Sequence, residues 1–457
     1  MQTNQILKAS ITLIAFCSWA IVSIAQKKEA YEMTINGVKV IVQPSNNDIV
    51  EIETIIKGGV QNYPENKQGI ESLAMTALTE CGTANDDKNS FKNKLDKVSA
   101  QLNGTSGMDF STFNLNCIKG DFDVVWPLYV DALTTPVFNI KEFDRIKQDA
   151  INNLKVNESE PDNAINKLAR LTAFAGKDYA KSPEGTVDII SKLTADETKA
   201  YYHSILTRER LVIVVVGDID KTVLEQKIKM LLNKDIYSGK PLNLKKEAFN
   251  PTHNTFKSQK KDLATNYLVG VTGGPLPGTA DYNAFNLAMQ IFYDRDFLEV
   301  RTNNGLSYAP YTYFAGELNP YSAIAVSTTD PNKYIQVANN LINKTKKDGF
   351  RDEELKNMKT TYLTGFFYKL ETNKAQAASL ASNQVLHNDW RRALTINEDV
   401  KKITVADLNR AFNKYFTKLS WVYQGDPSKV NPALFTSSST DKIKLPPSKL
   451  IKRGNSF

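Results

Sequence analysis

The sequence predicts an α+β protein with two homologous domains, each a mostly antiparallel sheet covered by helices. In both halves, strand-like runs with period-2 alternation are followed by several amphipathic runs at helical spacing and then by one more strand. This order is found once in residues 26–236 and again in residues 254–428. Because the second half repeats the plan of the first, a duplicated domain is the simplest explanation.

A short sequence echo supports the duplication. In the first half, Thr194 precedes a helical run whose following strand ends at Gly217. In the second half, Thr404 precedes a helical run whose strand ends at Gly425. Threonine hydroxyls accept hydrogen bonds from the first free amides of a helix, so we expect both threonines to be N-caps.

Length and composition restrict the class of protein. With 457 residues, 41% hydrophobic and 23% charged, the chain has the composition of a globular protein of two or three domains. The net charge of +7 is mild for this length, and acidic and basic residues are interspersed. No arginine-rich stripe is present, so we expect no nucleic-acid partner.

Residues 1–25 have the pattern of a secretory signal peptide. Lys8 forms a short basic region, Ile11–Ala25 is uncharged, and the small Ser23 and Ala25 precede the expected cleavage site. An uncleaved anchor is the alternative, although the apolar run is short for a membrane span. The pattern predicts export across the inner membrane to the periplasm, with no membrane span after cleavage.

The first domain is expected in residues 26–236. Asn36-Gly37 predicts a β-hairpin, because both residues tolerate the positive φ of a type I′ turn. The further expected strands are Ile49–Ile56, a pair around Ser106-Gly107 and Leu211–Val216. The expected helices are Gly69–Glu80, Ser90–Leu102, Asp121–Leu133, Lys141–Val156, Asp162–Phe174 and Ala195–Ile205. Cys81 and Cys117 are the two cysteines of the mature chain, and their spacing leaves open a disulfide or two buried thiols.

The second domain is expected in residues 254–428, after a polar linker at 237–253. Its expected elements are strand Tyr267–Thr272, helix Tyr282–Val300, strands to Thr328, and helices Lys333–Lys346, Asp352–Leu370 and Asn373–Leu386. Residues 429–457 contain six basic residues and one acid, interrupted by Pro446-Pro447, and predict an extended basic tail.

The stretch from Phe297 to Tyr308 contains the candidate binding residues, Arg301 and Tyr308. It is expected to end a helix, turn at Gly305 and begin a strand at Leu306. A guanidinium and a phenol hydroxyl are suited to the carbonyl oxygens of an extended peptide. The alternative is a surface arginine that caps its helix and a tyrosine that packs on the sheet.

Three local motifs resemble a known family. They are Gly69-Ile70 with Gly82-Thr83, the Lys192–Asp196 to Gly217-Asp218 pattern, and Arg301 followed by Gly305-Leu306-Ser307-Tyr308. Together with the duplication, they resemble the pitrilysin/insulinase-like zinc peptidases, and in particular the processing-peptidase branch. The resemblance extends from about Val40 to Asp426 and implies a clam-shell assembly with a partner.

The metal motif of that family is replaced in this chain. Active members carry His-x-x-Glu-His on the first helix, where Ser72, Met75 and Thr76 stand here. The third ligand, a glutamate on a later helix, corresponds to Asn152 or Asn153. None of these side chains is an ordinary zinc ligand or a base near neutral pH. The resemblance therefore implies no metal, no cofactor and no catalytic residue in this chain, with zinc expected only on a partner subunit.

The resemblance implies a non-catalytic partner subunit of a secreted heterodimeric zinc metalloendopeptidase. Arg301 and Tyr308 would then hold an unfolded or short peptide substrate for a homologous, zinc-bearing subunit. A structural or assembly core protein derived from the same fold, in which both residues are relics, is the main alternative. A standalone peptidase with other ligands is a further one, although only three histidines are present.

Overall fold

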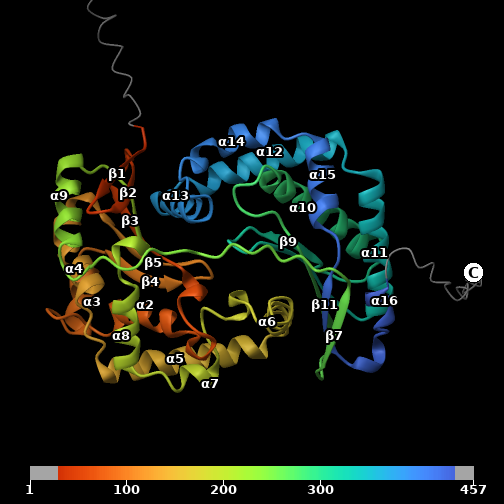
Figure 1. Cartoon of the computed structure of the whole chain (residues 1–457), viewed down its shortest axis with the longest axis horizontal. Helices are drawn as coiled ribbons and strands as arrows, with labels where there is room; N and C mark the ends of the chain where they lie inside the picture. Colours follow the sequence, from red (N-terminus) through yellow and green to blue (C-terminus); the bar gives the residue numbers. More distant parts are fainter. Residues whose placement is uncertain (1–28, 438–457) are drawn as a thin grey trace, which may run out of the picture.

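The computed structural model describes residues 29–437, in which the chain forms two mixed β-sheets, each packed with helices (Figure 1). Within these residues, one strand pair in each sheet is parallel, β2–β6 in the first and β7–β11 in the second. All other strand pairs are antiparallel. The predicted α+β class with mostly antiparallel sheets is therefore confirmed.

The first sheet has the strand order β1-β2-β6-β3-β5-β4. Its strands are β1 (Tyr31–Ile35), β2 (Val38–Gln43), β3 (Ile49–Lys57), β4 (Gln101–Ser106), β5 (Phe110–Ile118) and β6 (Leu211–Val216). The helices of this half are α2 (Ile70–Glu80), α3 (Lys88–Lys97), α4 (Phe122–Thr134), α5 (Ile140–Ser159), α6 (Pro161–Ala173), α7 (Val187–Ile190), α8 (Ala195–Ile205) and α9 (Lys221–Leu232). The predicted hairpin is present, with φ of 47° at Asn36 and 83° at Gly37.

The second sheet has the strand order β7-β11-β8-β10-β9. Its strands are β7 (Thr255–Lys260), β8 (Asn266–Thr272), β9 (Tyr311–Ala315), β10 (Tyr321–Thr328) and β11 (Ser420–Gly425). The helices of this half are α10 (Asp281–Phe297), the π-helical turn η6 (Leu298–Asn303), α11 (Pro331–Asp348), α12 (Asp352–Lys369), α13 (Asn373–His387), α14 (Arg392–Lys402), α15 (Val405–Tyr415) and α16 (Ala433–Thr436).

Each half contributes one helix to the sheet of the other half. The helix α13 packs on β3 and β6, where Leu380 and Ala377 lie in one buried cluster with Ile41 and Val214. Reciprocally, α6 packs on β8 and β11 of the second sheet. Figure 1 shows α13 beside the N-terminal strands, far from the strands that are its neighbours in sequence. The two halves are therefore interlocked through buried apolar surface.

Local capping agrees with the sequence. The Thr194 side chain accepts a hydrogen bond from the Glu197 amide, and that of Thr404 accepts one from the Asp407 amide. Cys81 and Cys117 are both free and buried, so the question of a disulfide is settled in favour of two separate thiols.

Several boundaries differ from those predicted. The helix expected to run to Leu102 ends at Lys97, because residues 101–106 pair with β5 as edge strand β4. The strand expected from Leu306 begins only at Tyr311, after Pro310. The helices α9 and α14 and the strand β7 were not predicted.

The two ends of the chain extend beyond the described part. The predicted signal peptide and the larger part of the predicted tail lie outside the described residues. The first residues of that predicted tail are packed, since Val430 and Phe435 are buried in the second core. Within residues 29–437, no helix combines the length and the apolar character needed to cross a membrane.

Candidate functional site

The Arg301 to Tyr308 segment closes the C-terminal end of α10. The helix widens into the π-helical turn η6, and Gly305 adopts a φ of 59° that reverses the chain. The Leu306 amide then donates to the Val300 carbonyl at 2.9 Å, which fixes the turn. As a result, Arg301 lies in the last helical turn, and Tyr308 lies in the loop that leads to β9.

The Arg301 guanidinium contacts two aromatic rings. Its central carbon lies 4.0 Å from the centroid of the Tyr308 ring and 4.9 Å from that of Phe297. Tyr308 is 78% exposed, so this stack is at the surface. Among residues 29–437 no carboxylate pairs with Arg301 and no hydrogen bond is made by its guanidinium. The two rings thus contact the guanidinium, whereas its N–H groups are available to a ligand.

Phe297, the third member of this cluster, was not predicted from the sequence. Phe297 precedes Arg301 by four residues on the helix, and side chains at this spacing are neighbours on a helix surface. Phe297 contacts Tyr293, which in turn contacts Tyr311 of β9. The helical spacing of Tyr293, Phe297 and Arg301 is the signal that could have identified this aromatic row.

A buried carboxyl group lies beneath the same segment. Asp296 is 1% exposed, accepts a hydrogen bond from Thr312 of β9 at 3.2 Å, and has no partner for Oδ1 among the described residues. Burial raises the pKa of Asp296 to about 7. The pair links α10, which leads into η6 and Arg301, to β9, which follows Tyr308.

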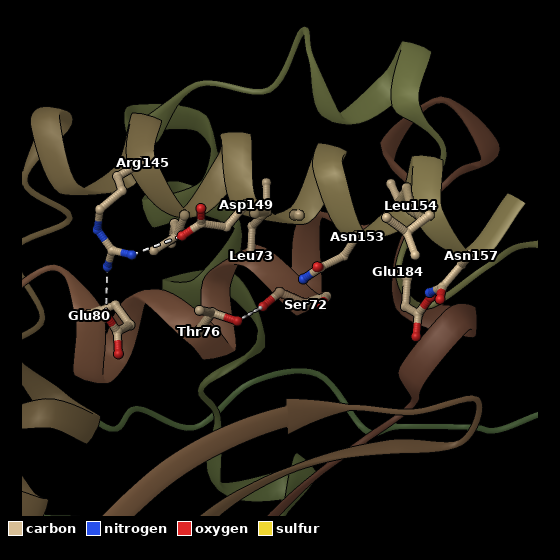
Figure 2. Close-up of a pocket in the computed structure, with 13 residues that line it drawn as sticks. Ser72, Leu73, Thr76, Glu80, Arg145, Asp149, Asn153, Leu154, Asn157 and Glu184 are labelled. Carbon is tan, nitrogen blue, oxygen red and sulfur yellow. Dashed lines mark hydrogen bonds and ion pairs between the residues drawn. The ribbon is translucent and has the colours of Figure 1, made fainter. Parts of the chain in front are cut away.

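The positions of the missing metal motif form a second candidate site. A cavity of about 590 Å³ lies between α2 and α5. Its lining residues are Ser72, Leu73, Thr76, Glu80, Arg145, Ile146, Asp149, Ala150, Asn153, Leu154, Val156, Asn157 and Glu184. The structure thus brings together Ser72, Thr76 and Asn153, as Figure 2 shows. Asn152 does not line the cavity, and Met75 is fully buried in the first core.

A buried carboxyl group fixes the start of α2 and so orients Ser72. Glu71 is fully buried and accepts hydrogen bonds from Ser111 at 2.5 Å, from Asn62 at 3.0 Å and from Tyr201. Burial raises the pKa of Glu71. Because these donors come from three other elements, α2 is fixed in rotation about its axis and Ser72 faces the cavity.

The charged end of the cavity is closed by its own ion pairs. Arg145 donates to Glu142 at 3.0 Å, to Asp149 at 2.9 Å and to Glu80 at 2.5 Å. Glu80 also pairs with Lys92. These contacts lower the pKa of Glu80 despite its partial burial. The carboxylates at this end are therefore already neutralised.

The residues present do not fit a zinc ion. Zinc in proteins is bound by imidazole, thiolate or carboxylate groups. Here Ser72 and Asn153 offer only a neutral hydroxyl and an amide, and the Thr76 hydroxyl already donates to the Ser72 carbonyl at 2.9 Å. Within residues 29–437, no three histidine, cysteine, aspartate or glutamate side chains come close enough together to hold a metal ion.

The two candidate sites belong to different halves. Arg301 and Tyr308 are carried by elements of the second sheet, whereas the cavity lies between α2 and α5 of the first half, and no residue of η6 lines it. Any ligand that contacts both must therefore extend between the halves or between two chains.

Comparisons with known proteins now identify the family. The model of Insulinase (Peptidase family M16) matches residues 39–187, and the model of the Peptidase M16 inactive domain matches residues 192–362. Together the two models span more than half of the chain. The chain belongs to the insulinase (peptidase M16) family. The resemblance found in the sequence is confirmed at this level.

Individual proteins are similar over most of the chain. The uncharacterized zinc protease YmxG of Bacillus subtilis is 20% identical over 385 residues, which cover 82% of this chain and 92% of that protein. Human mitochondrial cytochrome b-c1 complex subunit 2 is 19% identical over 401 residues, which cover 83% of this chain and 85% of that protein. The crystal structure of a peptidase M16 inactive domain from Pseudomonas fluorescens superposes with a TM-score of 0.79 at 17% identity, covering 87% of this chain and 98% of that one.

Proposed function

We propose that this M16 protein is the peptide-binding, non-hydrolytic subunit of a heterodimeric zinc endopeptidase in the periplasm. The observation that carries the proposal is the Arg301 stack. An arginine with no acidic partner among the described residues, held by contacts with the Tyr308 and Phe297 rings, retains N–H groups that can donate to carbonyl oxygens. Tyr308 adds an exposed hydroxyl beside it.

The degenerate metal motif supports the assignment of hydrolysis to a partner. Ser72, Asn153 and the buried Met75 supply neither ligands nor a base. A homologous subunit with an intact His-x-x-Glu-His motif would supply both. The periplasmic location rests on the signal-like pattern of residues 1–25.

Reconstitution with a secreted, zinc-bearing relative from the same organism tests the proposal. The two purified chains are mixed, and hydrolysis of an unfolded peptide is measured for each chain and for the mixture. We expect a specific heterodimer that buries more than roughly 1,000 Å² in total, with hydrolysis by the mixture. We also expect substoichiometric zinc in this chain by elemental analysis. Equal hydrolysis by the relative alone would contradict the proposal.

A structural role is the second candidate function. It is favoured by the similarity to human cytochrome b-c1 complex subunit 2 over most of both chains. In that case a pull-down from the native organism should recover a membrane-bound assembly without peptidase activity. Substitution of Arg301 should then change neither assembly nor any hydrolysis.

A further inference from the structure

Two rows of hydrogen-bonding side chains face the cavity between α2 and α5. Ser72 and Thr76 lie on α2, and Asn153 and Asn157 lie on α5. Each pair is separated by four residues, so its members are about 6 Å apart along the helix axis. Two residues of an extended peptide span about 6.5 Å. The spacing in both rows therefore matches the two-residue repeat of an extended main chain.

Most of these groups are free to bind a ligand. Within the described part of the chain, the side chains of Ser72, Asn153 and Asn157 make no hydrogen bond, whereas Thr76 donates to the Ser72 carbonyl. Figure 2 shows Asn153 above Ser72 and Asn157 further along α5, near Glu184. A primary amide both donates and accepts, as a peptide unit does, so each asparagine can pair with one peptide group.

Apart from the carboxylate of Glu184, the rest of the cavity is suited to a neutral, extended ligand. Leu73, Ile146 and Leu154 line it and are buried, which provides an apolar base for the ligand's side chains. The ion pairs of Arg145 close the opposite end, as described above. A volume of about 590 Å³ is within the range of ligand-binding pockets and suffices for a few peptide residues.

We propose that this cavity binds the main chain of an extended peptide segment through Ser72, Asn153 and Asn157. Recognition by hydroxyl and amide groups thus takes the place of metal coordination at this position of the fold. The inference rests on the proposed peptide-binding function and adds a second contact region, in the first half, to Arg301 and Tyr308. It implies that this chain binds peptide without its partner.

Fluorescence anisotropy with a labelled, unfolded ten-residue peptide and the mature chain alone tests the inference. We compare the wild type with the Asn153→Leu/Asn157→Leu variant, which retains the number and branching of the side-chain heavy atoms and removes the amides. Asn152→Leu is the matched control, because Asn152 is exposed on the same helix and does not line the cavity. We expect the double variant to bind roughly tenfold more weakly or worse, and Asn152→Leu to bind normally.

Two further measurements keep the test decisive. If the double variant melts at a lower temperature than the wild type, two other measurements replace it. One is peptide binding by Ser72→Ala, and the other is binding of a peptide with alternate amides N-methylated to the wild type. Both changes should weaken binding. Chelator should leave the affinity unchanged, since no metal is involved. Wild-type affinity in all these variants, absence of peptide binding by the wild type, or loss of binding with chelator would overturn the inference.

The failure of this inference can be distinguished from that of the proposed function. The cavity is tested by binding to the single chain, whereas Arg301 is tested by hydrolysis in the assembled pair. If the cavity variants bind normally while Arg301→Ala slows the pair, the inference fails and the proposed function stands. If the cavity variants lose affinity while Arg301→Ala has no effect, the cavity binds peptide and the role proposed for Arg301 fails.

Discussion

The guanidinium of Arg301 lies over the ring of Tyr308, with 4.0 Å between its central carbon and the ring centroid. This contact joins the π-helical turn η6 to the loop before β9, and it orients the arginine without neutralising it. A cation–π contact at an exposed site contributes only about 0.5–1 kcal/mol. The stack can therefore be exchanged for contacts with a peptide at little cost.

The first prediction concerns catalysis by the assembled pair. Arg301→Ala should lower kcat/KM on the order of ten- to a hundredfold, because a charge-assisted hydrogen bond to a carbonyl contributes about 1.5–3 kcal/mol. Tyr308→Phe retains the stacked ring and loses only the hydroxyl, so its effect should be smaller. The measurement is kcat/KM on an unfolded peptide, with pairing and melting temperature determined for each variant.

Arg301→Lys is the control for this prediction. It preserves the charge but lacks the planar fork and the flat face that stacks on Tyr308, so it should restore little activity. Normal kinetics for both Arg301→Ala and Tyr308→Phe, with pairing intact, would instead assign the two residues to the scaffold and favour the structural role.

The second prediction is a pH dependence of stability that arises from Asp296. Burial raises its pKa from 3.8 to about 7 in the folded protein. The unfolded chain therefore releases this proton near pH 4 and the folded chain only near pH 7. The contribution of Asp296 to the free energy of unfolding is therefore largest below pH 4. It falls between pH 4 and pH 7, by at most about 4 kcal/mol in total, and stays constant at higher pH.

Comparison with Asp296→Asn isolates this contribution from other titrating groups. Burial and the nearby Asp296 carboxylate raise the pKa of Tyr334 well above its usual value, so Tyr334 does not titrate in the pH range of this test. The free energy of unfolding of the variant, minus that of the wild type, should rise between pH 4 and pH 7 and then level off. Chemical denaturation at several pH values measures it. A constant difference across this range would show that Asp296 does not titrate in this way.

The third prediction follows from the interlocked helices. Leu380 of α13 is 1% exposed and packs in the cluster formed on the first sheet. Leu380→Ala should destabilise the protein by about 2–5 kcal/mol, because it leaves a cavity between the two halves. Leu394→Ala is the matched control, since Leu394 is 51% exposed.

The same variant reports on cooperativity. Because α13 belongs to the second half in sequence and to the first sheet in space, both halves should unfold in one transition at a lower temperature. Circular dichroism and tryptophan fluorescence should give the same midpoint. Two separated transitions, with only one of them shifted, would contradict this coupling.

The fourth prediction concerns the two cysteines. Burial raises the pKa of Cys81 and that of Cys117 to about 12, so neither thiol is ionised near neutral pH. Native protein should therefore react slowly with a thiol reagent, and denatured protein should titrate two thiols per mature chain. Reductant should leave the melting temperature unchanged. A reductant-sensitive melting temperature would indicate a disulfide that the structure does not contain.

Local patterns in the sequence determined much of the fold. The Asn36-Gly37 turn, the caps at Thr194 and Thr404 and the helical run of α8 depend on residues near one another in the chain, so periodicity and turn chemistry suffice to predict them. The family motif and its departure at Ser72 and Thr76 were likewise readable, because they are matters of residue identity and spacing.

Contacts between residues far apart in the sequence could not be predicted, because they depend on packing in three dimensions. The exchange of α6 and α13 between the halves depends on apolar surfaces far apart in sequence, and an amphipathic pattern does not name its partner. Likewise, the sequence does not determine which side of α2 Asn153 faces, because α2 and α5 are far apart in the chain. The burial of Met75 in the core also depended on packing. Helical spacing shows which residues share a face of α2, but it does not show whether that face points to the core or to the cavity.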